Sequence, residues 1–171
     1  MADYRDYHAT IFLAPELAGP IEALRREWDP DMAAQIAAHV TVAYPREAPI
    51  ADLLVDRVRE ASERSRPFRL RLGGIACFER PEHGVYVAVE DVDGGYRMLR
   101  EHVLRPPFQG PAFPAHVTLV HPRTSHRGLD FWERGGYQPQ NQEFTAKEVA
   151  ITAFDGARWV VLATYTLAAT R

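Results

Sequence analysis

Two short segments of this chain carry a histidine followed two residues later by a threonine. The first spans residues 38–42 and reads AHVTV, and the second spans residues 115–119 and reads AHVTL. Valine, leucine and threonine favour β-strands, and side chains alternate between the two faces of a strand. Each segment is therefore expected to present one imidazole and one hydroxyl side by side on the same face.

A pair of histidines suits general acid–base catalysis on a phosphodiester. The unperturbed pKa of histidine is about 6.5, so one imidazole can take a proton from an entering water while the other gives one to a departing ribose oxygen. The threonine hydroxyls can donate hydrogen bonds to the charged non-bridging phosphate oxygens. We interpret His39 and His116 as catalytic residues, and Thr41 and Thr118 as residues that bind the substrate phosphate.

The elements around the two segments follow the same order. A strand at 8–13 and a helix at 16–28 are expected before the first segment, and a strand at 85–89 and a helix from 93–94 before the second. Pro45 and Pro122 end the two motif strands, because proline cannot donate a ladder hydrogen bond. This repetition predicts a duplicated architecture with the two motifs close to half the chain apart.

The rest of the chain completes each half. Apolar spacing predicts a helix at 50–64 and a short helix near 125–134. Two hairpins are expected, one joining strands 68–78 and 85–89 and the other joining strands 144–154 and 157–167. The sequence thus predicts an α+β fold with two pseudo-twofold-related antiparallel sheets, helices on the outside, and the motif strands facing a central cleft.

We expect a single bilobal domain over residues 1–171. Its lobes would be residues 1–82 and 83–171, with an exchange of strands between them allowed and the lobe that owns strand 85–89 left open. The net charge of −3 and pI near 6.2 argue against binding to duplex DNA but allow a small anion. The polar N-terminal residues and the lack of a long apolar stretch favour a cytoplasmic protein without a membrane partner, and a monomer is the default.

Four further residues are candidates for contact with substrate. His8 and His121 lie at strand ends near the proposed site, and Arg123 follows two residues after His121. Tyr44 stands five residues after His39, as His121 stands after His116, and its ring could stack on a base. Strict alternation would nevertheless turn Tyr44 away from His39.

The chain offers little support for a metal site. It lacks a His-Glu-x-x-His motif, a cysteine cluster and an acidic ligand set beside either motif. His116, His121 and His126 are spaced by five residues, which places alternate members on opposite faces of a strand. We therefore expect neither a metal nor another cofactor.

Two His-x-Thr-x motifs on strands, half a chain apart in a chain of this size, resemble the 2H phosphoesterase superfamily, which includes the 2′-5′ RNA ligase-like and cyclic phosphodiesterase proteins. The resemblance covers nearly the whole chain. It implies a bilobal fold with a central groove, metal-independent action on 2′,3′-cyclic phosphates or 2′-5′ linkages, and small nucleotides or RNA 3′-ends as partners. It also implies that His39 and His116 are catalytic and that Thr41 and Thr118 bind phosphate.

The chain departs from the family after the second motif. Many 2′-5′ RNA ligase-like members carry an arginine where this chain has His121, with Arg123 only two residues on. RNA ligation is therefore less expected than hydrolysis. Two other hypotheses stay open: a nucleotide-binding or RNA-end-binding module with little turnover, and an unrelated metal hydrolase.

Overall fold

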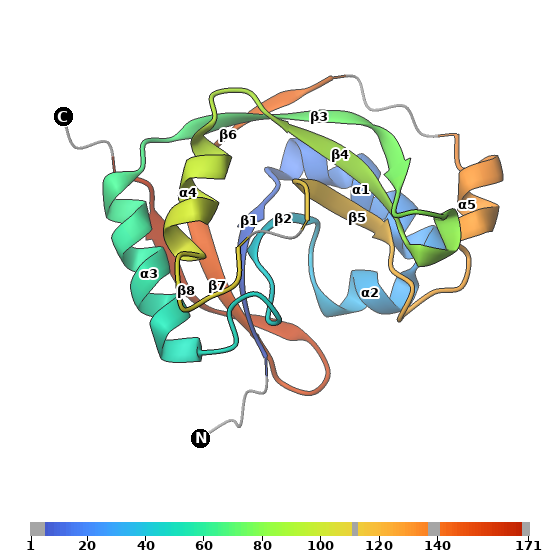
Figure 1. Ribbon diagram of the computed structural model, residues 1–171. Coiled ribbons are helices and arrows are strands. Elements are labelled where there is room, and N and C mark those ends of the chain that lie inside the picture. The colour runs from blue at the N-terminus through green and yellow to red at the C-terminus, as the bar shows by residue number, and fades with distance from the viewer. Residues whose placement is uncertain (1–5, 111–112, 137–140, 169–171) are drawn as a thin grey trace.

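The two motif segments lie on strands of different sheets. In the computed structural model, which describes residues 6–110, 113–136 and 141–168, β2 (His39–Ala43) is the outer strand of a four-stranded sheet ordered β2-β1-β7-β8. β5 (His116–Val120) is the outer strand of a second four-stranded sheet ordered β5-β4-β3-β6. The two motif strands lie against each other in the middle of the molecule (Figure 1).

All strand pairs described in the two sheets are antiparallel, and helices pack against both, which confirms the expected α+β fold. The remaining strands are β1 (Tyr7–Phe12), β3 (Phe68–Cys77), β4 (Val85–Asp91), β6 (Glu143–Ala146), β7 (Glu148–Phe154) and β8 (Trp159–Thr166). The helices are α1 (Pro15–Trp28), α2 (Pro30–Gln35), α3 (Ala51–Arg64), α4 (Gly95–Val103) and α5 (Gly128–Arg134), with a 3-10 turn η1 (Pro81–His83). None of the helices in the described part of the chain has the length and apolar character needed to cross a membrane.

Each sheet takes strands from both sides of residue 82. β3 precedes that residue and lies in the second sheet, whereas β7 and β8 come late in the chain and lie in the first. β4, whose place the sequence left open, pairs with both β3 and β5. The expected hairpins β3–β4 and β7–β8 are both present.

The segment 144–154 was expected to form one strand, and this expectation was wrong. Residues 143–146 form β6, which pairs with β3, whereas residues 148–154 form β7, which pairs with β1 and β8 in the other sheet. The physical reason is burial. The run Val149–Ala153 is buried at every position, as suits a central strand covered on both faces, whereas β6 is a mostly exposed outer strand.

A short helix that the sequence analysis did not predict follows the first one. Asp29 ends α1 and begins α2, and its side chain accepts a hydrogen bond from the backbone N–H of Met32 at 3.1 Å. Pro30 occupies the first position of α2, where its missing N–H costs nothing. The Asp-Pro pair therefore caps a new helix instead of only closing the earlier one.

The helices connect the two halves of the molecule. α1 packs against β5 and α4 packs against β2, so each helix contacts the motif strand of the other half. The buried carboxylate of Asp29 accepts hydrogen bonds from the His121 backbone N–H and the Thr124 hydroxyl, both at 2.8 Å. The Tyr96 hydroxyl of α4 donates to the Thr41 carbonyl at 2.6 Å. Neither motif strand is therefore held by its own half alone.

We predict that Gly95→Ala lowers the free energy of unfolding by about 1–3 kcal/mol, because an added methyl would overlap the buried side chain of Phe68. Gly74→Ala is the matched control, since no atom lies within 4 Å of the position of its added methyl. Urea denaturation measures both changes. Equal stability of the Gly95→Ala variant and the wild type would contradict the close packing of α4 on β3.

Candidate active site

The two motif histidines are held in the same way. Nδ1 of His39 lies 2.7 Å from the carbonyl oxygen of Ala37, and Nδ1 of His116 lies 2.7 Å from that of Pro114. Because a carbonyl only accepts hydrogen bonds, each Nδ1 carries a proton and donates it to the residue two positions earlier. Nε2 of each neutral imidazole is then the nitrogen that accepts a hydrogen bond or a proton.

His8 completes the first half of the site. Its Nε2 lies 3.0 Å from the Thr41 hydroxyl, and its ring lies 5.1 Å from that of His39, edge to face. Nδ1 of His8 is buried without a hydrogen-bond partner among the described residues. We place the proton on Nε2, since an unpaired buried N–H is the rarer case. The sequence analysis named His8 as a candidate, and it indeed lies beside His39 and Thr41.

Tyr44 connects the two halves of the site. Its hydroxyl donates to Nε2 of His116 at 3.1 Å, and the two rings are nearly parallel at 18° with centroids 6.2 Å apart. Strict alternation predicted that Tyr44 faces away from His39, and the contacts of Tyr44 are indeed with His116 and with the ring of His8, 5.7 Å away. β2 ends at Ala43, so Tyr44 lies just beyond the strand.

Aromatic rings that the sequence analysis did not assign to the site surround His116. Phe78 and Tyr86 lie 5.1 and 4.9 Å from its ring, and Phe113 lies 5.1 Å from Tyr44. Tyr86 pairs with Thr118 across β4 and β5, so the predicted face of the second motif strand could have indicated it. The other rings come together through long-range contacts that have no local signal.

Two further aromatic residues lie beside His8 and His39. Trp159 lies 4.9 Å from the His8 ring, and Phe12 lies 6.1 Å from the His39 ring. Both also line a groove beside α2 that includes Ala37. Neither ring was among the residues expected at the site from the sequence, yet both lie next to candidate site residues.

The remaining candidates lie nearer the edge of the site. Thr118 is half-buried on β5. The backbone N–H of His121 is bound to Asp29, and its Nδ1 accepts a hydrogen bond from the Arg123 backbone N–H at 3.1 Å. The Arg123 side chain is exposed. The structure thus brings His8, Thr41 and Tyr44 together with the two motif histidines and leaves Arg123 outside this group.

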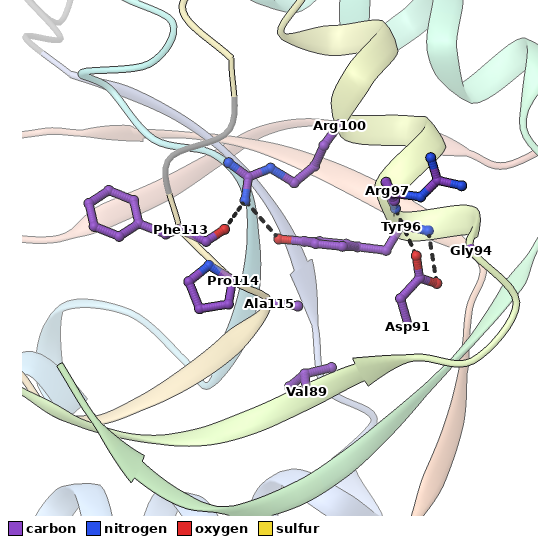
Figure 2. Close-up of a pocket in the computed structure, with 9 residues that line it drawn as sticks. All are labelled: Val89, Asp91, Gly94, Tyr96, Arg97, Arg100, Phe113, Pro114 and Ala115. Atoms are coloured by element: carbon purple, nitrogen blue, oxygen red, sulfur yellow. Dashed lines mark hydrogen bonds between the residues drawn. The ribbon is translucent and has the colours of Figure 1, made fainter. Parts of the chain in front are cut away.

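A second groove lies on α4 behind the second motif (Figure 2). Asp91 caps α4 by accepting hydrogen bonds from the backbone N–H groups of Tyr96 and Arg97. Arg100, from the next turn of the helix, reaches the carbonyl of Phe113 in the segment that leads to His116. Neither motif histidine lines this groove, which is connected to the site through that segment and through the hydrogen bond from Tyr96 to the Thr41 carbonyl.

The structure keeps the motif imidazoles neutral. The pKa of His39 is lowered to about 4, mainly by burial, with smaller contributions from the charges of Arg25 and His116 and an opposing one from the Ala37 carbonyl. Burial likewise lowers the pKa of His116, with an added contribution from the charge of Arg100. Both imidazoles are therefore unprotonated near neutral pH, and an anion placed between them would favour protonation.

The described side chains do not form a metal site. Within residues 6–110, 113–136 and 141–168, no group of three or more histidine, cysteine, aspartate or glutamate residues is arranged to bind a metal ion. His116, His121 and His126, which the sequence analysis considered for this role, form no such group.

Comparison with known proteins gives a family and a fold. The model described as the 2′-5′ RNA ligase superfamily matches residues 13–158. Similar solved structures include E. coli LigT complexed with 3′-AMP (TM-score 0.65, 19% identity, covering 96% of this chain and 99% of that chain). A phosphoesterase has a TM-score of 0.66 and 18% identity, covering 95% of this chain and 98% of that chain. The protein TT0787 of Thermus thermophilus has a TM-score of 0.61 and 17% identity, covering 95% of this chain and 97% of that chain. No curated protein matches this chain in sequence.

We predict that the free energy of unfolding falls as the pH is lowered from about 6.5 towards about 4. His39 has a pKa of about 4 when folded and about 6.5 when unfolded. Between these values the unfolded chain binds a proton that the folded chain does not, so acid favours unfolding. The stabilising contribution is complete above pH 6.5 and is lost as the pH falls through about 4.

Urea denaturation at pH 7 and pH 5 measures this effect. His39→Gln should lose less stability between the two pH values than the wild type. His126→Gln, at an exposed loop position, should behave like the wild type. The same pH dependence in His39→Gln and the wild type would contradict the lowered pKa of His39 in the folded protein.

Proposed function

Because this chain belongs to the 2′-5′ RNA ligase superfamily of 2H phosphoesterases, we propose that it hydrolyses 2′,3′-cyclic phosphates or 2′-5′-linked nucleotides, with His39 and His116 as general base and general acid. One observation carries the proposal. Both imidazoles donate Nδ1–H to a carbonyl two residues earlier, so Nε2 is the nitrogen of each that can transfer a proton, on two strands that lie against each other. On His116 this requires substrate to displace the Tyr44 hydroxyl from Nε2.

The proposed reaction balances with one neutral and one protonated imidazole. The oxygen of a water molecule attacks phosphorus, and its proton passes to Nε2 of the neutral histidine. The bond from phosphorus to one ribose oxygen breaks, and that oxygen takes the proton from Nε2 of the imidazolium. From a 2′,3′-cyclic phosphate the product is a nucleoside monophosphate with a free ribose hydroxyl, and from a 2′-5′ linkage one fragment keeps the phosphate and the other leaves with the hydroxyl. Each proton transfer contributes typically about 10²- to 10⁴-fold in rate.

The lowered histidine pKa values fit this scheme once substrate is present. Both imidazoles are neutral in the free protein because burial disfavours the charged form. A phosphodiester carries a negative charge, which raises the pKa of a neighbouring imidazole. The proton for the leaving oxygen is thus held best when substrate is bound. We expect no metal ion to be needed, since imidazoles and hydroxyls supply both the proton transfer and the hydrogen bonds.

Thr41 and Thr118 are proposed to bind the non-bridging phosphate oxygens. His8, with its proton on Nε2, donates to the Thr41 oxygen, so the Thr41 hydroxyl keeps its own proton to donate. In the free protein the acceptor of this proton is the Tyr44 oxygen, and the phosphate would take its place. A hydrogen bond from this hydroxyl to a phosphate oxygen would be charge-assisted and therefore stronger than a neutral one. His8 would thus direct the Thr41 proton to the substrate.

The surrounding rings favour a nucleotide as the substrate. Stacking of a base on an aromatic side chain contributes about 1–3 kcal/mol and tolerates any base. Phe78 and Tyr86 border His116, and Trp159 borders His8, so rings lie near both motif strands. E. coli LigT, which shares this fold, has been crystallised with 3′-AMP, ATP and NADP+. We propose small nucleotides or RNA 3′-ends as the substrates of this chain.

The test is hydrolysis of 2′,3′-cyclic nucleotides in EDTA, with the product isomers separated. The wild type should hydrolyse the cyclic nucleotides, and His39→Ala and His116→Ala should each lose about 10²- to 10⁴-fold in kcat/KM. His126→Ala, at an exposed position, is the matched control and should keep full activity.

Two results would contradict the proposal. Activity that EDTA abolishes would favour a metal hydrolase. Binding without turnover would favour the alternative of a nucleotide-binding or RNA-end-binding module, in which Tyr44 remains on Nε2 of His116. The isomer formed identifies which ribose oxygen leaves.

A further inference from the structure

Two arginines are almost completely buried behind the motif strands. The side chains of Arg25 on α1 and Arg100 on α4 are 1% and 2% exposed. Arginine is rarely buried to this extent unless its charge is paired. Each of these two lies beside a glutamate, Glu22 at 3.0 Å and Glu47 at 2.6 Å respectively.

Arg100 holds the chain just before the second motif. One nitrogen of its guanidinium donates to Glu47, and the other donates to the carbonyl of Phe113 at 2.8 Å (Figure 2). Phe113 is followed directly by Pro114, whose carbonyl accepts the Nδ1 proton of His116. The arginine and the imidazole therefore bind two consecutive carbonyls.

Arg25 holds the chain before the first motif in the same way. Its guanidinium donates to Glu22 with one nitrogen and to the carbonyl of Ile36 at 2.7 Å with the other. Ile36 is followed by Ala37, whose carbonyl accepts the Nδ1 proton of His39. In both halves the arginine binds the carbonyl three residues before the histidine, and the histidine binds the carbonyl two residues before itself.

The glutamates extend this arrangement to the neighbouring backbone. Glu22 also accepts a hydrogen bond from the backbone N–H of Ala38, directly before His39. Glu47 accepts one from the backbone N–H of Tyr44, directly after β2, at 3.1 Å. The two arginine–glutamate pairs thus bind main-chain groups at the ends of the motif strands, where the regular ladder of the sheet does not reach.

We propose that Arg25 and Arg100 are positioning residues, each of which fixes the backbone that orients one motif histidine. Because the arginine holds one carbonyl, the next peptide unit cannot rotate freely, so the Nδ1–H···O=C bond keeps one geometry and one tautomer. The planar fork of arginine is needed because it binds a carboxylate and a carbonyl at the same time, whereas lysine offers a single charged nitrogen. The expected effect of the arginines on the reaction rate rests on the proposed function, whereas their expected effect on the histidine tautomer does not.

The same arginines also influence the charge of the histidines. The charge of Arg25 lowers the pKa of His39, and that of Arg100 lowers the pKa of His116. Loss of either arginine should therefore change the ionisation of one histidine much more than that of the other. A residue with only a structural role would not produce this selectivity.

The experiment records the histidine ring nitrogens of the ¹⁵N-labelled protein by NMR, which distinguishes the two tautomers without any substrate. Two double variants are compared. The Arg100 variant combines Arg100→Met with Glu47→Gln, and the Arg25 variant combines Arg25→Met with Glu22→Gln. Each double variant removes both charges of the ion pair, and the glutamine oxygen can still accept the backbone N–H. Asp29, whose buried carboxylate also interacts with Arg25, keeps its hydrogen bonds from His121 and Thr124. Arg97→Met on α4 and Arg26→Met on α1 are matched controls at exposed positions.

In the wild type and both controls, His39 and His116 should each show the Nδ1–H tautomer alone. The Arg100 variant should populate the Nε2–H tautomer of His116 and leave His39 unchanged, and the Arg25 variant should do the reverse. In hydrolysis assays each variant should lose about 10²-fold, mainly in kcat, which is the cost of misplacing a reacting group. Arg100→Lys should not restore the wild-type rate.

The proposal is overturned if both histidines keep the Nδ1–H tautomer in both arginine variants, or if the controls change them equally. A wild type that never turns over cyclic nucleotides would defeat the proposed function instead. The NMR comparison would still decide the role of the arginines in that case.

Discussion

A histidine can offer one ring nitrogen to a substrate reliably only when a partner holds the other. In this protein that partner is the backbone: Nδ1 of each motif histidine donates to the carbonyl two residues earlier at 2.7 Å. The bond forms because each motif strand is entered from a segment that turns its carbonyl back towards the ring. The tautomer, the direction of Nε2 and the position of the neighbouring threonine all depend on it.

That local bond needs support from distant parts of the chain. The motif strands are outer strands of two different sheets, so each is bound by a ladder on one side only. Helices from the opposite halves pack on them, and buried arginines and an aspartate bind the main chain at their ends. The site is therefore a product of both halves, and its histidines are placed by residues far from them in sequence.

The two halves of the site hold their histidines in the same way, but different residues surround each histidine. His39 lies beside His8 and Phe12, and Trp159 lies next to His8. His116 lies beside Tyr44, Phe78 and Tyr86. A phosphodiester is also unsymmetrical, because water enters on one side and a ribose oxygen leaves on the other. The difference between the two surroundings gives the protein a physical basis for binding such a substrate in one orientation.

The sequence predicted those features that follow from local pattern. Both motif strands were identified by alternation, in which Val40 and Val117 point away from the histidine and threonine of their strands. Both valines are fully buried. Repeated order and turn residues predicted the two sheets and their hairpins. Local pattern could not predict features that depend on contacts between distant segments. These are the division of 143–154 between two sheets, the position of Tyr44 on His116 and the roles of Arg25 and Arg100.

The most direct test of the account is a crystal structure of the protein with adenosine 3′-monophosphate. The account predicts that the phosphate lies between β2 and β5, within hydrogen-bond distance of Nε2 of both His39 and His116, with the Tyr44 hydroxyl displaced from His116. A phosphate that contacts only one of the two histidines, or that binds in the groove on α4, would contradict the claim that the two motifs act together on one phosphoryl group.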